Sequence, residues 1–84
     1  MLAKKLLRPR NKWDGALIKI KNKVPYYSLQ LMIEMHAGVN PDQSDWEVAF
    51  EYIDYSYMSN DELKVVIVDD LDEPRPEPMD IPDE

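Results

Sequence analysis

The chain has 84 residues, a formal net charge of −7 and 44% apolar side chains, which leaves room for a single domain. It contains no cysteine, which excludes a disulfide scaffold, a thiolate zinc site and a cysteine nucleophile, and which is typical of a cytosolic protein. No apolar run approaches the roughly 18 residues of a membrane span or forms the apolar stretch of a secretory signal near the N-terminus.

Charge is divided between the two ends of the chain. Residues 1–23 carry eight lysines or arginines against one aspartate, whereas residues 24–84 carry two basic residues against sixteen carboxylates. Such a division indicates charged partners for one end or both. We expect residues 1–12 to form a basic arm, and its candidate assembly contacts are Lys4, Lys5, Leu6, Leu7, Arg8 and Arg10.

The first expected element after this arm is a short strand over residues 15–21. Isoleucines alternate there with lysines, a pattern that is typical of a half-buried strand at the edge of a sheet. Asn22 and Lys23 follow directly, and we expect them to turn the chain.

Residues 25–37 support two interpretations. Apolar side chains recur there at every second position, which suits a strand. The composition instead favours a helix, because Leu, Gln, Met, Glu and Ala are helix formers. Pro25 suits a first helical turn, and Gly38 followed by Val39 resembles a Schellman motif at a helix end. We interpret the segment as a helix.

Residues 44–58 are predicted to form an amphipathic helix. Ser44 and Glu47 have the spacing of a capping box. The residues at helical spacing that form its apolar stripe are Trp46, Ala49, Phe50, Ile53 and Tyr57. A strand whose alternate aromatic residues face inward is the alternative.

Residues 63–68 are short and β-branched, so strand and helix compete closely there. We favour a strand, because the strand at residues 15–21 otherwise lacks a hydrogen-bonding partner. The expected fold is therefore a small α+β domain over residues 13–70, with the order β-α-α-β. An antiparallel β meander of four strands is the alternative.

Residues 71–84 are expected to form an extended acidic tail. Prolines at positions 74, 76 and 78 fix the backbone and remove amide donors, which excludes a helix or a central strand. Met79 and Ile81 are the candidate apolar anchors of this tail in an assembly.

The sequence offers little chemistry. His36 is the only histidine, the serines lack an evident base, and the two glycines form no phosphate-binding loop. We therefore expect neither enzymatic activity nor a cofactor or metal.

The outer face of the helix at residues 44–58 is the strongest candidate for binding a partner. Carboxylates and two tyrosines lie off its apolar stripe, and tyrosine is a common anchor of protein interfaces. The candidate partner-binding residues here and just beyond are Glu47, Glu51, Tyr52, Asp54, Tyr55, Asp61 and Glu62.

These features predict a non-enzymatic subunit or accessory factor of a larger assembly, for instance a phage virion or its assembly machinery. It would bind a protein partner or its own copies, in the cytoplasm or in a virion, without contacting a membrane. The alternative is an acidic inhibitor that mimics nucleic acid and blocks a basic site on a host protein. Nucleic acid itself is expected only at the basic arm, because the rest of the chain repels phosphate.

Overall fold

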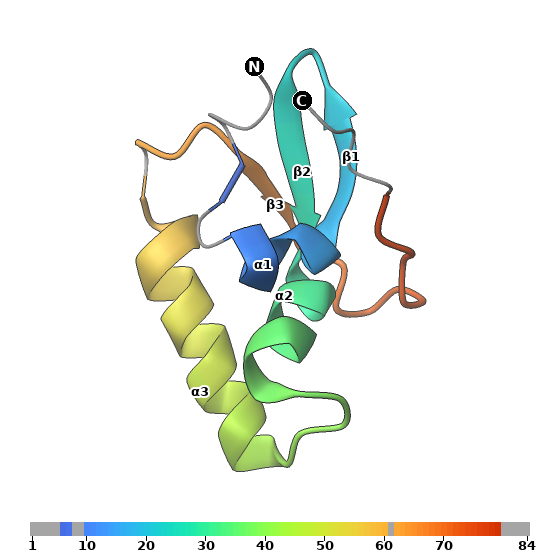
Figure 1. Ribbon diagram of the computed structural model, residues 1–84. Coiled ribbons are helices and arrows are strands. Elements are labelled where there is room, and N and C mark those ends of the chain that lie inside the picture. The colour runs from blue at the N-terminus through green and yellow to red at the C-terminus, as the bar shows by residue number, and fades with distance from the viewer. Residues whose placement is uncertain (1–5, 8–9, 61, 80–84) are drawn as a thin grey trace.

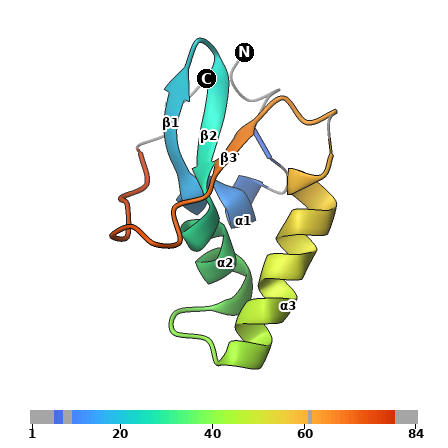
Figure 2. The ribbon, with the colours of Figure 1, turned by 180° about the vertical axis from the view of Figure 1, so that it is seen from behind.

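The computed structural model describes residues 6–7, 10–60 and 62–79, which form an α+β fold (Figure 1). In chain order its elements are α1 (Arg10–Trp13), the 3-10 turn η2 (Asp14–Ala16), β1 (Leu17–Lys21), β2 (Val24–Ser28), α2 (Leu29–Ala37), α3 (Gln43–Ile53), the π-helical turn η3 (Asp54–Met58) and β3 (Val66–Val68). The strands form one sheet in the order β1-β2-β3, and α2 and α3 lie together at one end of it (Figures 1 and 2). The predicted α+β class is confirmed, and the four-stranded meander is wrong.

β1 and β2 form an antiparallel hairpin. Asn22 and Lys23 close it with φ angles of 52° and 66°, the left-handed backbone that a two-residue hairpin turn requires. The expected turn is therefore present, but residues 25–28 continue into a strand and not into a helix. Pro25 pairs with β1 and lies before the part of β2 that pairs with β3.

β3 is a strand, as favoured from the sequence, but its partner is not the one expected. It pairs with β2 in parallel, with Tyr26 opposite Val66 and Ser28 opposite Val68. α2 and α3 form the crossover between these two strands, because parallel strands need a long connection. The expected order β-α-α-β therefore lacks β2, which lies in the middle of the sheet.

α2 starts four residues later than the sequence suggested. Ser28 is its N-cap, and the Oγ atom of Ser28 accepts a hydrogen bond from the backbone N–H of Leu31 at 3.2 Å. Gly38 ends the helix with φ 92°, a conformation that suits glycine, and its N–H donates to the carbonyl of Glu34 at 2.8 Å. Its ψ of 174° is extended, so the helix end is not the expected Schellman motif.

α3 confirms the predicted amphipathic helix, but with a different cap. Asp42 is the N-cap, and its carboxylate accepts the backbone N–H of Asp45 at 2.8 Å. Ser44 lies inside the helix, so the predicted capping box at Ser44 is wrong. The carboxylate of Asp42 satisfies a free amide of the first turn and also favours the positive end of the helix dipole.

The core draws on residues from most of the described chain. Trp13 is its largest fully buried side chain, and the indole Nε1–H of Trp13 donates to the hydroxyl of Tyr57 at 3.0 Å. The buried apolar residues are Leu6, Leu7, Trp13, Ala16, Leu17, Tyr27, Leu29, Leu31, Met32, Ile33, Ala49 and Ile53. The predicted stripe of α3 faces this core, with Ala49 and Ile53 fully buried.

Asp70 fastens the chain after β3 to the N-terminus of α2. Its carboxylate is buried, with 5% of the residue exposed, and accepts the hydroxyl of Ser28 at 2.6 Å and the backbone N–H of Gln30 at 3.1 Å. The side-chain amide of Gln30 donates in return to the carbonyl of Asp70 at 2.6 Å. Each of these groups therefore has a partner inside the fold.

The described part of the acidic tail lies against the domain. The backbone N–H of Met79 donates to the carbonyl of Leu17 in β1 at 2.8 Å. The guanidinium of Arg75 donates to both carboxylate oxygens of Glu34, at 2.9 and 3.2 Å. The hydrogen bonds that Arg75 donates to the carboxylate of Glu34 raise the pKa of Arg75, which stays charged in any case.

Candidate protein-interaction surface

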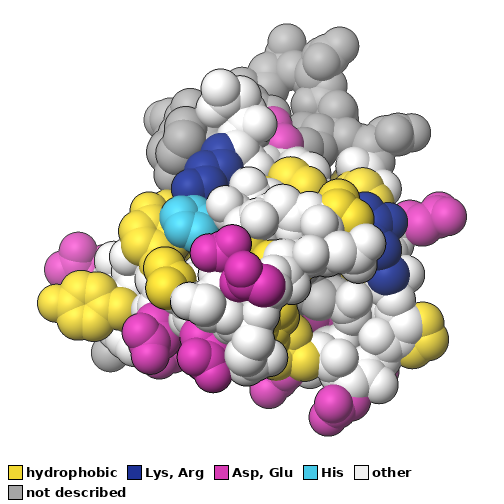
Figure 3. All heavy atoms as spheres, turned by 90° about the horizontal axis from the view of Figure 1, so that it is seen from below, with side chains coloured by type: hydrophobic (Ala, Val, Ile, Leu, Met, Phe, Trp, Pro, Cys, Tyr) yellow, Lys and Arg dark blue, Asp and Glu magenta, His cyan; other side chains and the backbone are white. Residues whose placement is uncertain are grey.

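Three of the predicted partner-binding residues form one acidic stripe on the outside of α3 and η3. Glu47, Glu51 and Asp54 are all exposed and lie at positions i, i+4 and i+7, which places them on one helix face over about 10 Å of axis. No lysine or arginine lies in α3 or η3 to neutralise them. Figure 3, which views the molecule from below, shows several exposed acidic side chains at the end that holds α2 and α3.

The two predicted tyrosines differ in their surroundings. Tyr55 is 85% exposed and lies next to the acidic stripe. Tyr52 is 40% exposed, but its ring stacks on the imidazole of His36 with 4.6 Å between ring centroids. Tyr55 is therefore the aromatic side chain that this face offers to a partner, whereas Tyr52 helps to hold α3 against α2.

His36 belongs to a small polar and aromatic cluster at the side of this face. The ammonium of Lys12 lies 2.9 Å from Nδ1 of His36 and 5.3 Å from the ring centre of Tyr52. Partial burial, and then the charge of Lys12, lower the pKa of His36. The imidazole is consequently neutral near pH 7 and accepts the hydrogen bond from Lys12, which is a structural role.

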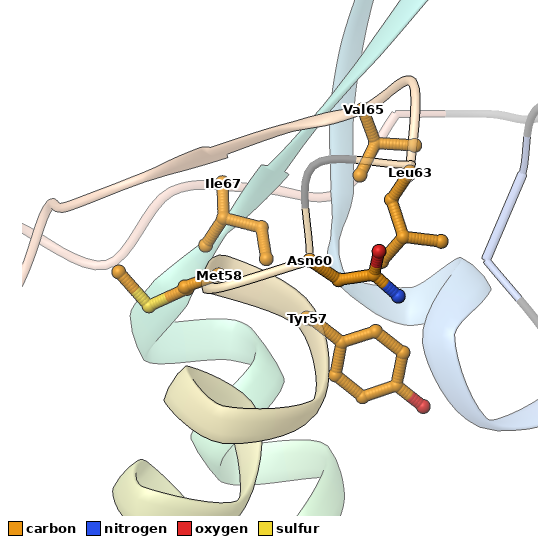
Figure 4. A pocket seen from close by; sticks show the side chains of 6 residues that line it. All are labelled: Tyr57, Met58, Asn60, Leu63, Val65 and Ile67. Carbon is orange, nitrogen blue, oxygen red and sulfur yellow. The ribbon is translucent and has the colours of Figure 1, made fainter.

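A cavity of about 290 Å³ lies beyond the acidic stripe, between η3 and the chain that enters β3 (Figure 4). In Figure 4 the side chains of Leu63, Val65 and Ile67 point toward the helix end, and they occupy alternate positions of an extended segment. The cavity is lined by Tyr57, Met58, Asn60, Leu63, Val65 and Ile67. It is at the small end for a cofactor pocket but suits an apolar side chain of a partner.

The sequence did not predict this cavity. Residues 63–68 indicated only a short β-branched strand, whereas in the structure the partly buried side chains of Leu63, Val65 and Ile67 line the cavity. A shallower hollow, lined by Tyr55, Ser56, Ser59, Asn60 and Glu62, adjoins the cavity through Asn60. The predicted residue Glu62 is exposed and lines the shallower hollow, whereas Asp61 lies outside the described residues.

The candidate assembly residues of the two ends are placed differently from the expectation. Leu6 and Leu7 are buried in the core of their own chain, and the backbone N–H of Leu7 donates to the hydroxyl of Tyr27 at 2.9 Å. Met79 is half-buried and packs against the same core. The side chains of Leu6, Leu7 and Met79 therefore pack within their own chain. The remaining candidates, Lys4, Lys5, Arg8, the side chain of Arg10 and Ile81, lie outside the part of the chain that the structure describes.

Comparisons of the chain with protein-family models, with curated proteins and with solved structures find no significant match. Among the described residues, no group of three His, Cys, Asp or Glu side chains is arranged to hold a metal ion. In the same ranges, no helix combines the length and the apolar character needed to cross a membrane.

Proposed function

We propose that this protein is a non-enzymatic interaction factor, a subunit or accessory component of a larger assembly, that binds a basic surface of a partner protein. The observation that carries the proposal is the acidic stripe of Glu47, Glu51 and Asp54 beside the exposed ring of Tyr55. Carboxylates attract a basic partner over distance and fix its orientation. Tyrosine then supplies contact area with little loss of side-chain freedom.

The rigidity of this face supports the same proposal. Ala49 and Ile53 bury the inner side of α3, and the ring of Tyr52 is stacked on α2. The carboxylates therefore project from a helix that is already held in place. A preorganised face loses less freedom on binding than a loop of the same composition.

Comparative affinity capture from the cells that express the protein would test this proposal. We expect the double variant Glu51→Lys with Tyr55→Ala to capture at least one protein in an amount at least tenfold smaller than the unaltered chain captures. Glu77→Lys is the matched control, because it makes the same charge change at an exposed tail position. If no captured protein distinguishes the double variant from this control, the face does not bind a partner.

The second candidate is an acidic inhibitor that occupies a nucleic-acid-binding site. The regular spacing of three carboxylates along one helix face supports it, because regularly spaced negative charge is what such a site recognises. Light scattering and a displacement assay separate the two candidates. A stable homo-oligomer favours the structural subunit, whereas a monomer that displaces DNA from its captured partner favours the inhibitor.

A further inference from the structure

The two edges of the sheet differ in what covers them. At the β1 edge, the tail contributes a hydrogen bond from the N–H of Met79 to the carbonyl of Leu17. At the opposite edge, β3 bonds to β2, and within the described ranges no hydrogen bond reaches its outer side. Val66 in this strand is 36% exposed. Figure 2 shows β3 on the side of the sheet away from β1. An open edge strand is a template for another extended segment.

The cavity beside η3 lies under this open edge. Leu63, Val65 and Ile67 line it from the extended segment that runs into β3. A strand added to β3 would follow the same pleat, so every second side chain of the added strand would point to the side of the cavity. The cavity volume of about 290 Å³ is enough for an apolar side chain from that strand.

The charges near the cavity indicate which other side chains the added strand should carry. Asp54, Glu62 and Asp69 are exposed and lie within three positions of residues that line the cavity, and Lys64 is the one basic residue between positions 43 and 74. The cavity also adjoins the C-terminal end of the helix formed by α3 and η3, whose last turn contains no basic residue. The carbonyl end of a helix carries partial negative charge and attracts cations. An occupant with lysine or arginine therefore complements both the carboxylates and the helix end.

We propose that the partner of this protein contributes an extended basic segment that adds to the free edge of β3, with one apolar side chain in the cavity and a flanking lysine or arginine at Glu62. The inference rests on the proposed function and names the element of the partner that makes the contact. Main-chain hydrogen bonds to β3 supply affinity, and the cavity and the carboxylates select an apolar side chain between basic ones.

The test uses the full chain and a seven-residue peptide of alternating arginine and leucine, acetylated and amidated at its ends. We expect methyl signals of Leu63, Val65 and Ile67 to shift in NMR spectra on titration, and amide exchange across Val66–Val68 to slow. A peptide of alternating glutamate and leucine is the control probe, and we expect it to bind at least tenfold more weakly.

Two variants with the same charge change locate the contact. Glu62→Lys should weaken binding of the arginine peptide at least tenfold, whereas Glu77→Lys, at an exposed tail position outside both the cavity and the acidic stripe, should change it less than twofold. The titrations are run at physiological salt, where the Debye length of about 8 Å screens a remote charge.

Four outcomes would overturn the inference. The first is the absence of shifts at Leu63, Val65 and Ile67. The second is a set of shifts confined to α3 with no loss of binding in Glu62→Lys, which leaves the proposed function standing and refutes the edge of β3 as the binding site. The third is a dimer that the peptide dissociates, which would make a second copy of this chain the occupant of the edge. A captured partner that depends on Tyr55 but ignores Glu62→Lys would likewise refute only this inference.

Discussion

At the scale of single residues, Asp70 is the side chain whose removal should most clearly lower the stability of the fold. Alanine at this position leaves the buried hydroxyl of Ser28 and the N–H of Gln30 without their acceptor. We expect Asp70→Ala to lower the free energy of unfolding by about 2–4 kcal/mol, because charged hydrogen bonds are lost and buried donors are left unpaired. Urea denaturation measures this loss.

The control for this prediction is Asp72→Ala. Asp72 is exposed and only two positions away, so its replacement should change the stability by less than about 0.5 kcal/mol. Equal denaturation midpoints for the two variants would show that the carboxylate of Asp70 does not hold the chain to α2.

The pKa of His36 gives a second prediction at this scale. Burial and Lys12 place the pKa of the folded state below the ordinary value of 6.5. A depressed pKa means that the unfolded chain binds the proton more readily, so this contribution to stability is present above pH 6.5 and is lost as the pH falls through the lower folded pKa. NMR titration of the His36 ring measures that pKa directly.

Lys12→Met separates the two causes of the shift. Removing the ammonium should raise the pKa of His36, but not back to its ordinary value, because burial is the larger cause. A pKa at or above 6.5 in the unaltered protein would contradict the arrangement of Lys12, His36 and Tyr52.

At the scale of elements, sequence and structure differ in which residue caps α3. Asp42, and not Ser44, caps the helix. We expect Asp42→Ala to cost about 0.5–2 kcal/mol, the usual loss for a helix cap, and Ser44→Ala inside the helix to cost much less. Thermal denaturation of the two variants compares them, and a larger loss for Ser44→Ala would restore the predicted capping box.

The elements that could be predicted are those whose pattern is local. The helix at residues 43–58 follows from its own periodicity, and the strand at residues 17–21 from its alternation. β2 was missed because Leu29–Ala37 gave residues 25–37 a helical composition. The hairpin turn at Asn22 and Lys23 and the period-two pattern that follows it were the signal for a strand, and pairing with β1 and β3 outweighs local propensity there.

At the scale of the whole molecule, the two tryptophans should contribute unequally. Trp13 is fully buried and bonded to Tyr57, whereas Trp46 is only partly buried and stacks on Phe50. We expect Trp13→Ala to cost about 3–5 kcal/mol, a large share of the roughly 5–15 kcal/mol typical of a folded domain, and Trp46→Ala to cost less. Circular dichroism during urea denaturation measures both, and the reverse order would place the core elsewhere.

Only the part of the candidate surface that lies on a single helix could be predicted from the sequence. The carboxylates of α3 and Tyr55 follow from helical spacing, since a single amphipathic element decides which side is outward. The stacking of Tyr52 on His36, the burial of Leu6 and Leu7, and the cavity under β3 all join segments distant in sequence. A local sequence pattern does not predict which distant segment will cover a given side chain.

The parallel pairing of β2 with β3 has a consequence for how the protein forms during translation. The β1–β2 hairpin and the two helices precede β3 in the chain. The second neighbour of β2 is therefore made only after 37 further residues, and this pairing is long-range. Asp70 and Met79 come later still, and each bonds to a residue made early in synthesis, Ser28 or Leu17. The second edge of β2 therefore stays unpaired in the nascent chain until residues 66–68 have been made.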